Sequence, residues 1–220
     1  MSYQVQLLKG LFKPYSSSYQ LRKAEMMSGF WKKFIVLLLL SGLIHGISAY
    51  FGINNELLSK ELDSITLKEF EAHKILFAAG QVLWGLIVSV MSIYIPALFY
   101  WVFTDIEWRK MVVIQLFVLL ILLLEKLSQI PISLLLGLPD ISSPFSFGII
   151  AQIITKNEFL HELLAQITLF KIWMMVIQYK YIQAMSDRNS KLTVLLVILV
   201  NLFFIFVITF FHLLQLEKLL

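Results

Sequence analysis

The sequence predicts an all-α integral membrane protein, with five transmembrane helices preceded by a short amphipathic helix at the membrane surface. Of its 220 residues, 59% are apolar and 15% charged, and the mean hydropathy of +0.83 lies well above that of soluble domains. The apolar residues form solid blocks rather than the alternating strands of a transmembrane barrel. Lys and Arg gather on one side of these blocks, as membrane topology requires.

The apolar stretch at residues 111–137 is the block around which we expect the other helices to pack. At 1.5 Å per residue it spans roughly 40 Å, enough to cross a hydrocarbon core of about 30 Å with tilt. Glu125 and Lys126 lie near its midpoint, and Pro131 follows. A charge at that depth costs about 3 kcal/mol or more, so both side chains need partners or water.

The N-terminal segment, residues 1–33, is predicted to be cytoplasmic and basic. Four apolar residues recur there at helical spacing next to lysines, before Pro14 ends the pattern: Val5, Leu8, Leu11 and Phe12. We expect a short helix on the membrane surface, then a second amphipathic piece over 19–27. Trp31 with Lys32 and Lys33 would form an interfacial anchor.

Residues 34–220 are predicted to form one transmembrane domain, with spans at about 34–53, 75–103, 111–137, 158–179 and 192–214. Gly42 and Gly46 form a GxxxG pair in the first span, which lets a second helix approach closely. We interpret this pair as internal packing rather than a dimer face, while keeping it as a candidate partner contact. Pro96 and Pro131 are expected to kink the second and third spans.

Several local signals place the ends of these helices. Thr66 with Glu69 and Thr104 with Glu107 have the spacing of capping boxes, and Asn157 is a candidate N-cap for the fourth span. The apolar segment 145–154 is too short to cross the bilayer and is expected to be interfacial or re-entrant. Three aromatic residues are assigned to an interfacial belt: Tyr100, Trp101 and Trp108.

The distribution of Lys and Arg outside the spans predicts the orientation. Eleven fall in the N-terminal segment and in the loops at 104–110 and 180–191, against five in the remaining loops and the tail. The positive-inside rule therefore predicts a cytoplasmic N-terminus and an external C-terminus.

A buried charge cluster is the strongest candidate site. Its members are Glu125, Lys126, Glu162 and Lys171. We expect Glu125 and Lys171 to pair between adjacent antiparallel helices, because their depths match. We favour a fixed ion pair that determines how the helices dock; the alternative is a polar core that handles protons or ions.

We predict no catalytic, cofactor or metal site. Cysteine, a G-x-S-x-G motif, an HExxH motif and a Gly-rich phosphate loop are all absent from the sequence. His73, His161 and His212 are expected near the outer face, where with Glu162 they offer donors for a transition metal. Their spacing is not typical of metal sites. A lipid-modifying enzyme that uses these histidines is the third function class considered.

Two strings carry a resemblance to a known family: LFKPYSSSYQ at residues 11–20, and ITLFKIWMMVIQYKYIQAMSDRNSKLTVLLVILV at residues 167–200. With the five-span layout, with Phe170 and Trp173, and with the loop leading to Lys191, they make the chain similar to bacterial members of the YIP (Ypt/Rab-interacting protein) family. The chain lacks the DLYGP-like string of eukaryotic members, so Rab binding is not implied.

The resemblance implies a multi-pass protein of the bacterial cytoplasmic membrane that acts without catalysis. Bacterial members are similar to accessory subunits, some of them associated with exporters or peptide resistance. We therefore expect an accessory or scaffold protein whose partner is another integral membrane protein, with no role in nucleic-acid binding. The competing hypothesis is a small transporter or channel with a polar path between spans three and four.

Overall fold

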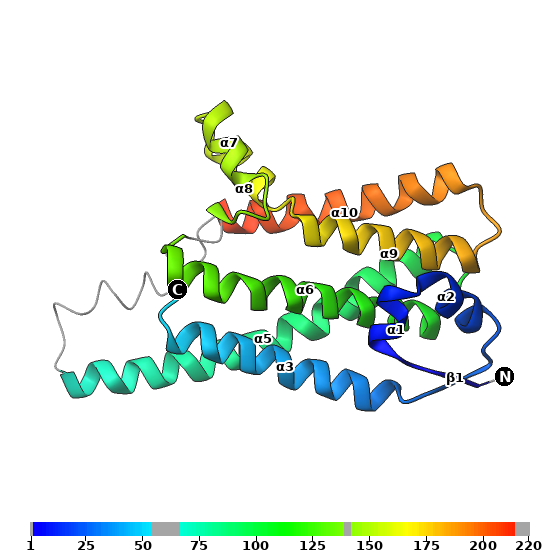
Figure 1. Cartoon of the computed structure of the whole chain (residues 1–220), viewed down its shortest axis with the longest axis horizontal. Helices are drawn as coiled ribbons and strands as arrows, with labels where there is room; N and C mark the ends of the chain where they lie inside the picture. The colour runs from blue at the N-terminus through cyan, green and yellow to red at the C-terminus, as the bar shows by residue number, and fades with distance from the viewer. Residues whose placement is uncertain (1, 54–66, 139–141, 214–220) are drawn as a thin grey trace.

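The computed structural model describes residues 2–53, 67–138 and 142–213 (Figure 1). Five long helices run alongside one another as an antiparallel bundle. They are α3 (Phe30–Tyr50), α5 (Leu67–Phe103), α6 (Trp108–Leu136), α9 (Leu169–Met185) and α10 (Ser190–Leu213). Successive long helices reverse direction, so α3 and α10 begin at the same end of the bundle and also finish at the same end.

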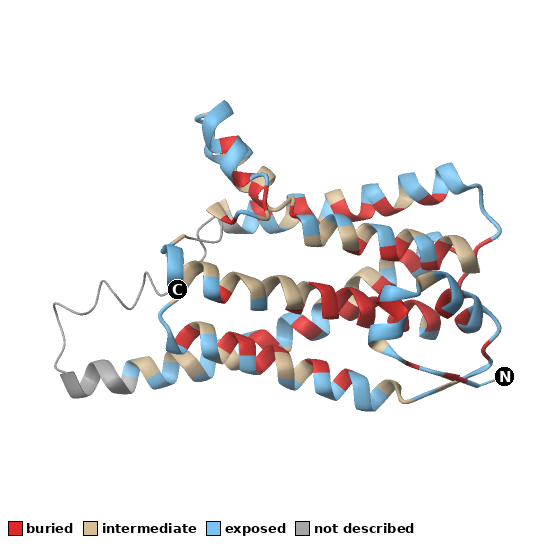
Figure 2. Ribbon diagram, in the orientation of Figure 1, coloured by how far each residue is buried: buried red, intermediate tan, exposed pale blue. Residues whose placement is uncertain are grey.

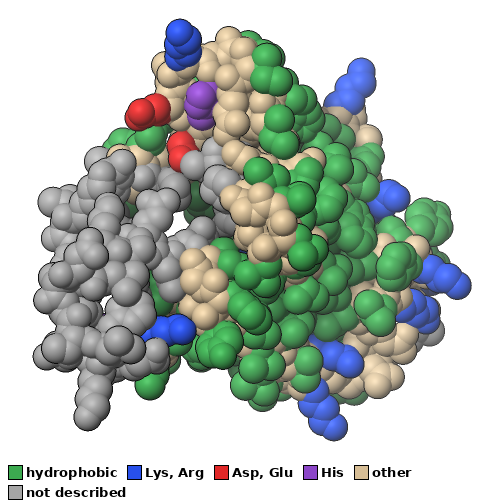
Figure 3. Space-filling model, turned by 60° about the vertical axis from the view of Figure 1, so that its left-hand side comes forward, with side chains coloured by type: hydrophobic (Ala, Val, Ile, Leu, Met, Phe, Trp, Pro, Cys, Tyr) green, Lys and Arg blue, Asp and Glu red, His purple; other side chains and the backbone are tan. Residues whose placement is uncertain are grey.

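Four of these helices are long and apolar enough to cross a membrane: Phe30–Tyr50, His73–Phe103, Trp108–Leu136 and Ser190–Phe211. The chain is therefore an all-α, multi-pass membrane protein in its main architecture. Figure 3 shows a broad band of hydrophobic side chains on the outside of the bundle, as expected for a surface that faces lipid.

Helix α6 is the centre of the bundle. It packs against α3, α5, α9 and the N-terminal helix α1 (Leu7–Phe12), and Figure 2 shows buried residues concentrated along its first half. Residues 110–121 are buried without interruption. A helix covered on all sides needs apolar residues on every face, which explains why this stretch is apolar except for Lys110 and Gln115. It ends at Gly137, whose φ of +64° closes the helix in the left-handed conformation.

The segment expected to be the fourth span is not one helix. It divides into α8 (Glu158–Ala165) and α9, with a break at residues 166–168. Two features make the break: the Thr168 side chain caps α9 by accepting from the Lys171 amide at 3.2 Å, and backbone bonds pair this segment with residues 145–147. Asn157 caps α8 as predicted, accepting from the amides of Phe159 and Leu160.

Helix α9 also ends later than expected, at Met185 rather than 179. With 17 residues it is shorter than the four helices named above, and by rise per residue it covers about 26 Å. It packs against α6 and α10 inside the bundle. The short helix α7 (Gly148–Ile154) occupies most of the segment expected at 145–154; it packs on α8 and projects away from the bundle (Figure 1).

The N-terminal residues form a compact cap of two short helices and two short strands. Along the chain, helices α1 and α2 (Pro14–Arg22) come between two short strands, β1 (Ser2–Gln4) and β2 (Met26–Ser28), which pair in parallel. The prediction of a second amphipathic piece over 19–27 is wrong, because β2 pairs with β1. Pro14 does end the first helix, since it opens the second.

The cap is fastened to the bundle by close contacts. Gly10 lies against the ring of Phe117 in α6, where an added Cβ would stand 2.3 Å from a ring carbon. The Tyr181 hydroxyl of α9 donates to the Gly10 carbonyl at 3.1 Å, and its ring stacks on Phe117. Arg22 pairs with Asp187, in the loop before α10, at 2.8 Å. The cap is therefore held against α6 and α9.

Two further expectations about the α5–α6 connection are wrong. The Thr104 hydroxyl donates to the Tyr100 carbonyl one turn earlier and does not cap α6, whose N-cap residue is Glu107 itself. The capping box predicted at the start of α5, Thr66 with Glu69, includes Thr66, which lies outside the described residues. Tyr100 does not belong to an interfacial belt either, because its side chain is fully buried.

Candidate functional site

The predicted charge cluster divides into two sites on different sides of α6. Glu125 and Lys126 are consecutive, so their side chains diverge by about 100° around the helix. Lys126 meets His45 of α3, whereas Glu125 acts electrostatically on Lys171 of α9. Helix α6 thus offers an acidic group to one neighbour and a basic group to another.

The first site lies between α6 and the break that precedes α9. The Lys171 ammonium is in electrostatic range of Glu125 and donates to Gln166 Oε1 at 2.6 Å. Gln166 is in the non-helical turn between α8 and α9. Glu162, the fourth predicted member, lies partly buried one turn earlier in α8. The turn between α8 and α9 therefore supplies the Gln166 side chain, whose amide oxygen accepts a hydrogen bond from Lys171 inside the bundle.

The second site joins α3 to α6 through His45 and Lys126. The Lys126 Nζ lies 3.2 Å from His45 Nε2, and His45 Nδ1 lies 2.9 Å from the Ser41 carbonyl. A carbonyl only accepts, so Nδ1 carries the hydrogen and the Nε2 lone pair accepts from the lysine. The contact places a neutral imidazole next to an ammonium group.

Small residues let this histidine fit between α3 and α5. A Cβ on Gly85 would stand 2.6 Å from the His45 Nδ1, so only glycine tolerates the imidazole there. The Ser41 hydroxyl donates to the Gly85 carbonyl at 2.9 Å. On the same interface, Gly42 and Gly46 face Val82 of α5 at 3.4 and 3.0 Å from their positions for a Cβ. Because α5 covers them, this glycine pair is not available to a partner helix.

Ser41 and His45 bring a hydroxyl and an imidazole together, a pairing that the sequence did not suggest. Their side chains are 3.5 Å apart, but the serine proton is directed at Gly85 and the histidine hydrogen at a carbonyl. Both residues are buried. The geometry fits a packing contact between helices and leaves the serine oxygen without a base to activate it.

A third polar group, which the sequence did not reveal as a unit, ties four helices together. Tyr100 donates to Gln178 Oε1 at 3.1 Å, and Asn201 Nδ2 lies 2.7 Å from the same oxygen and 3.0 Å from the tyrosine hydroxyl. Gln178 Nε2 donates to Gln115 Oε1 at 3.3 Å. These residues come from α5, α9, α10 and α6, and all four are buried.

Asn201 is the member that sequence reasoning missed. The signal available was its position as an amide within a charge-free apolar block, because an amide there is expected to bond across helices. Gln115 and Gln178 carry the same signal, an amide within an apolar block. Tyr100 was misplaced because a tyrosine near a span end has the same sequence signature whether it faces lipid headgroups or the core.

The remaining predicted residues do not converge on a site. His161 bonds the Thr155 carbonyl, His73 is exposed, and the side chain of His212 lies outside the described part. Within that part, no three His, Asp or Glu residues lie together as metal ligands would. Pro96 and Pro131 lie inside α5 and α6, which continue past them to Phe103 and Leu136.

Comparison with family models, with curated proteins and with solved structures finds no match to this chain. The YIP resemblance therefore remains an expectation from the residues quoted for it. Chemically, the polar side chains described above join helices to one another.

Proposed function

We propose that this chain is a non-catalytic accessory or scaffold subunit of a membrane complex, of the YIP type. The observation that carries the proposal is that Tyr100, Gln178 and Asn201, three buried side chains from three helices, are hydrogen-bonded to one another. Hydrogen bonds used in this way fix helix positions. A bundle of fixed shape suits a protein that presents its surface to another integral membrane protein, such as an exporter.

The proposed arrangement has five crossings, with α9 as the short fourth one, a cytoplasmic N-terminus and an external C-terminus in a bacterial cytoplasmic membrane. The position of α9 between α6 and α10 supports it. So does the polar break before α9, which a short span tolerates because its backbone groups bond to residues 145–147.

The cap is proposed to lie at the cytoplasmic interface. Several of its large apolar or aromatic side chains are exposed next to lysines: Leu8, Phe12, Tyr15 and Tyr19. Lys23 lies over the Tyr19 ring at 4.4 Å. Aromatic and basic side chains of this kind favour the headgroup region. Because the cap is also fastened to α6 and α9, it would hold one end of the bundle at a fixed depth.

Purification in mild detergent tests the accessory role. The tagged full-length chain is expected to retain one integral membrane protein in a fixed ratio, identified by mass spectrometry. E125Q should lower both the melting temperature and the recovery of that protein, since Lys171 loses its facing carboxylate. D105N, which changes an exposed acid in the α5–α6 connection, is the control and should alter neither.

A transporter with a polar path between the third and fourth spans is the second candidate, and Glu125 of α6 in electrostatic range of Lys171 of α9 favours it. That hypothesis predicts pH-dependent flux when the purified protein alone is placed in liposomes. If E125Q kept its melting temperature but lost such flux, the accessory role would be refuted. Protein-containing liposomes no more permeable than empty ones would count against the transporter.

A further inference from the structure

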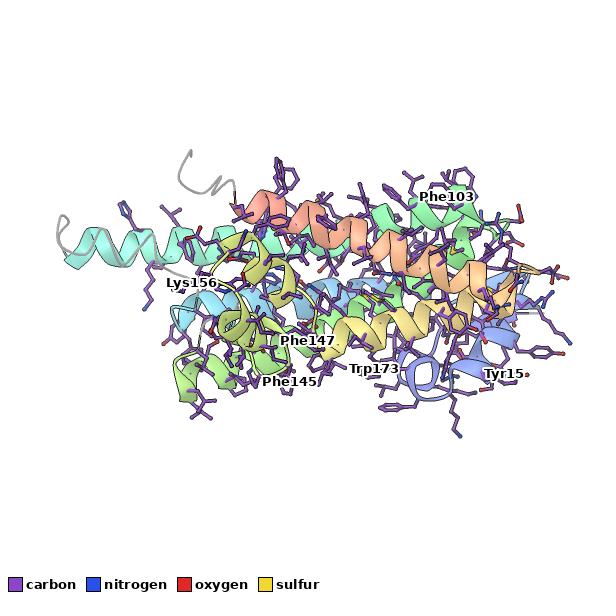
Figure 4. The ribbon with its side chains drawn as sticks, turned by 90° about the horizontal axis from the view of Figure 1, so that it is seen from above. Tyr15, Phe103, Phe145, Phe147, Lys156 and Trp173 are labelled. Atoms are coloured by element: carbon purple, nitrogen blue, oxygen red, sulfur yellow. The ribbon has the colours of Figure 1, made fainter. Side chains whose placement is uncertain are left out.

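The N-terminal cap has two unlike faces. Its inner face, which includes Gly10, Leu11 and Leu21, is buried. Its outer face exposes three lysines and four large apolar or aromatic side chains: Lys9, Lys13, Lys23, Leu8, Phe12, Tyr15 and Tyr19. Tyr15, at the outer edge of the molecule in Figure 4, is 87% exposed, and Phe12 is 75% exposed. Nothing in the described part of the chain covers this outer face.

The cap lies beside the long helices rather than beyond their ends. Gly10 touches Phe117, which is nine residues into α6 and therefore about 13 Å along its axis. The whole of α6, with 29 residues, covers about 44 Å, close to the thickness of a bilayer with its headgroups. The outer face of the cap therefore lies at the depth of the headgroups and faces sideways, toward lipid.

The charge of the outer face is positive and is not neutralised within the described structure. Residues 2–24 contain no acid. The nearby Asp187 is paired with Arg22, and none of the three lysines of the outer face forms an ion pair with a described carboxylate. Lys23 lies over the Tyr19 ring, with its ammonium 4.4 Å from the ring centre, so this charge is held next to an aromatic side chain.

We propose that the outer face of the cap binds the headgroups of anionic phospholipids in the membrane that the bundle spans. The lysine ammonium groups would donate to phosphate oxygens. Phe12 and Leu8 would contact the upper part of the acyl chains. A zwitterionic lipid offers the same phosphate next to a cation, so it gains less from three lysines than a lipid with net negative charge.

The apolar side chains distinguish a lipid from other anionic partners. An acidic segment of a soluble protein would satisfy the lysines but would leave Phe12 and Leu8 exposed to water. Surfaces that combine lysines with exposed apolar side chains gain from both parts of an anionic membrane. This binding rests on the interfacial position proposed for the cap, and it does not depend on the accessory role or on any protein partner.

The test uses the full-length chain in liposomes made of equal parts of phosphatidylglycerol and phosphatidylcholine. Because the chain contains no cysteine, S16C introduces one thiol on exposed Ser16 of α2, which then carries a fluorophore. Bromine is placed on the acyl chains of one lipid class or of the other, so the membrane charge is the same in both samples. We expect quenching by brominated phosphatidylglycerol to be several times stronger than quenching by brominated phosphatidylcholine.

Three sets of variants localise the preference. K9Q/K13Q/K23Q removes the charges of the outer face and should quench equally with both lipids. K9R/K13R/K23R keeps the charges and should keep the preference. K156Q is the control, because it removes a lysine at the opposite end of the bundle (Figure 4) and should behave like the parent. All three substitution sets change exposed side chains, and unchanged melting temperatures would verify that the bundle stays folded.

Equal quenching of the parent by the two lipids would overturn the proposal and would leave the outer face to an acidic protein segment. A preference that persists in K9Q/K13Q/K23Q would also overturn it, because the lysines would not be its source. Absence of quenching by either lipid would overturn both the lipid site and the interfacial position of the cap. None of these results changes the recovery of a partner protein, which tests the accessory role separately.

Discussion

The imidazole of His45 lies directly against the backbone of Gly85, so that a Cβ on this glycine would stand 2.7 Å from the ring Cγ. This approach brings α3 and α5 together at the depth where His45 reaches Lys126 of α6. The packing of α3, α5 and α6 at this depth therefore requires glycine at position 85.

Replacing Gly85 with alanine should destabilise the bundle by about 1–3 kcal/mol, the usual cost of an extra methyl group in a packed interior. The fall in melting temperature measures it. Gly80 lies one and a half turns earlier on α5, with nothing within 4 Å of its Cβ position. G80A should therefore be neutral or slightly stabilising, because alanine is the better helix former. Equal losses in the two variants would contradict the packing argument.

Asn201 should be the most sensitive polar residue of α10. In N201L the Gln178 oxygen and the Tyr100 hydroxyl lose a shared donor, and we expect a loss of about 1–2 kcal/mol, near the upper end for interhelical hydrogen bonds. Unfolding in a mixed detergent series measures it.

Tyrosine variants provide a control for the network. Y100F removes a buried hydroxyl that bonds two helices, whereas Y50F removes one from an exposed side chain at the end of α3. Y100F should lower stability and Y50F should not. A stable Y100F together with a stable N201L would mean that the network does not hold the helices.

Alanine at Gly10 should loosen the cap without unfolding the spans. The new methyl group collides with the Phe117 ring, so α1 must move away from α6. Limited tryptic cleavage at Lys9 or Lys23 should become faster, while the melting temperature of the bundle falls little. The double variant G10A/F117L makes room for the methyl group and should restore resistance; failure of this rescue would argue against the contact.

Single-cysteine labelling should show whether α9 crosses the membrane. The chain contains no cysteine, so K156C and R188C each introduce one reactive thiol. Figure 4 places Lys156 at the end of the bundle opposite Tyr15, and Arg188 follows α9 beside Asp187, the partner of the cap. An impermeant maleimide applied to intact cells should label K156C but not R188C. Labelling of both from outside would remove the fourth crossing.

Much of the helical architecture could be predicted because a membrane imposes it locally. An apolar block long enough to cross must be helical, whatever it packs against. This is why the expected spans one, two, three and five correspond to α3, α5, α6 and α10, with differences confined to their ends. The break in the fourth segment was not predicted, because it depends on backbone hydrogen bonds to residues 145–147. A count of apolar residues within the segment does not reveal such bonds.

The sites depended on tertiary structure to a greater degree. The sequence alone identified Glu125, Lys126 and Lys171 as groups that need partners, since the cost of a charge in the bilayer follows from its position in the chain. It matched Glu125 with Lys171 by depth, but it could not determine that Lys126 faces His45 of α3. The side that a residue faces depends on the rotation of its helix, and similar apolar residues on every face leave that rotation unspecified. Contacts between helices fix it, such as the close approach of Gly85 to His45 and the hydrogen bond of the Asn201 amide to Gln178.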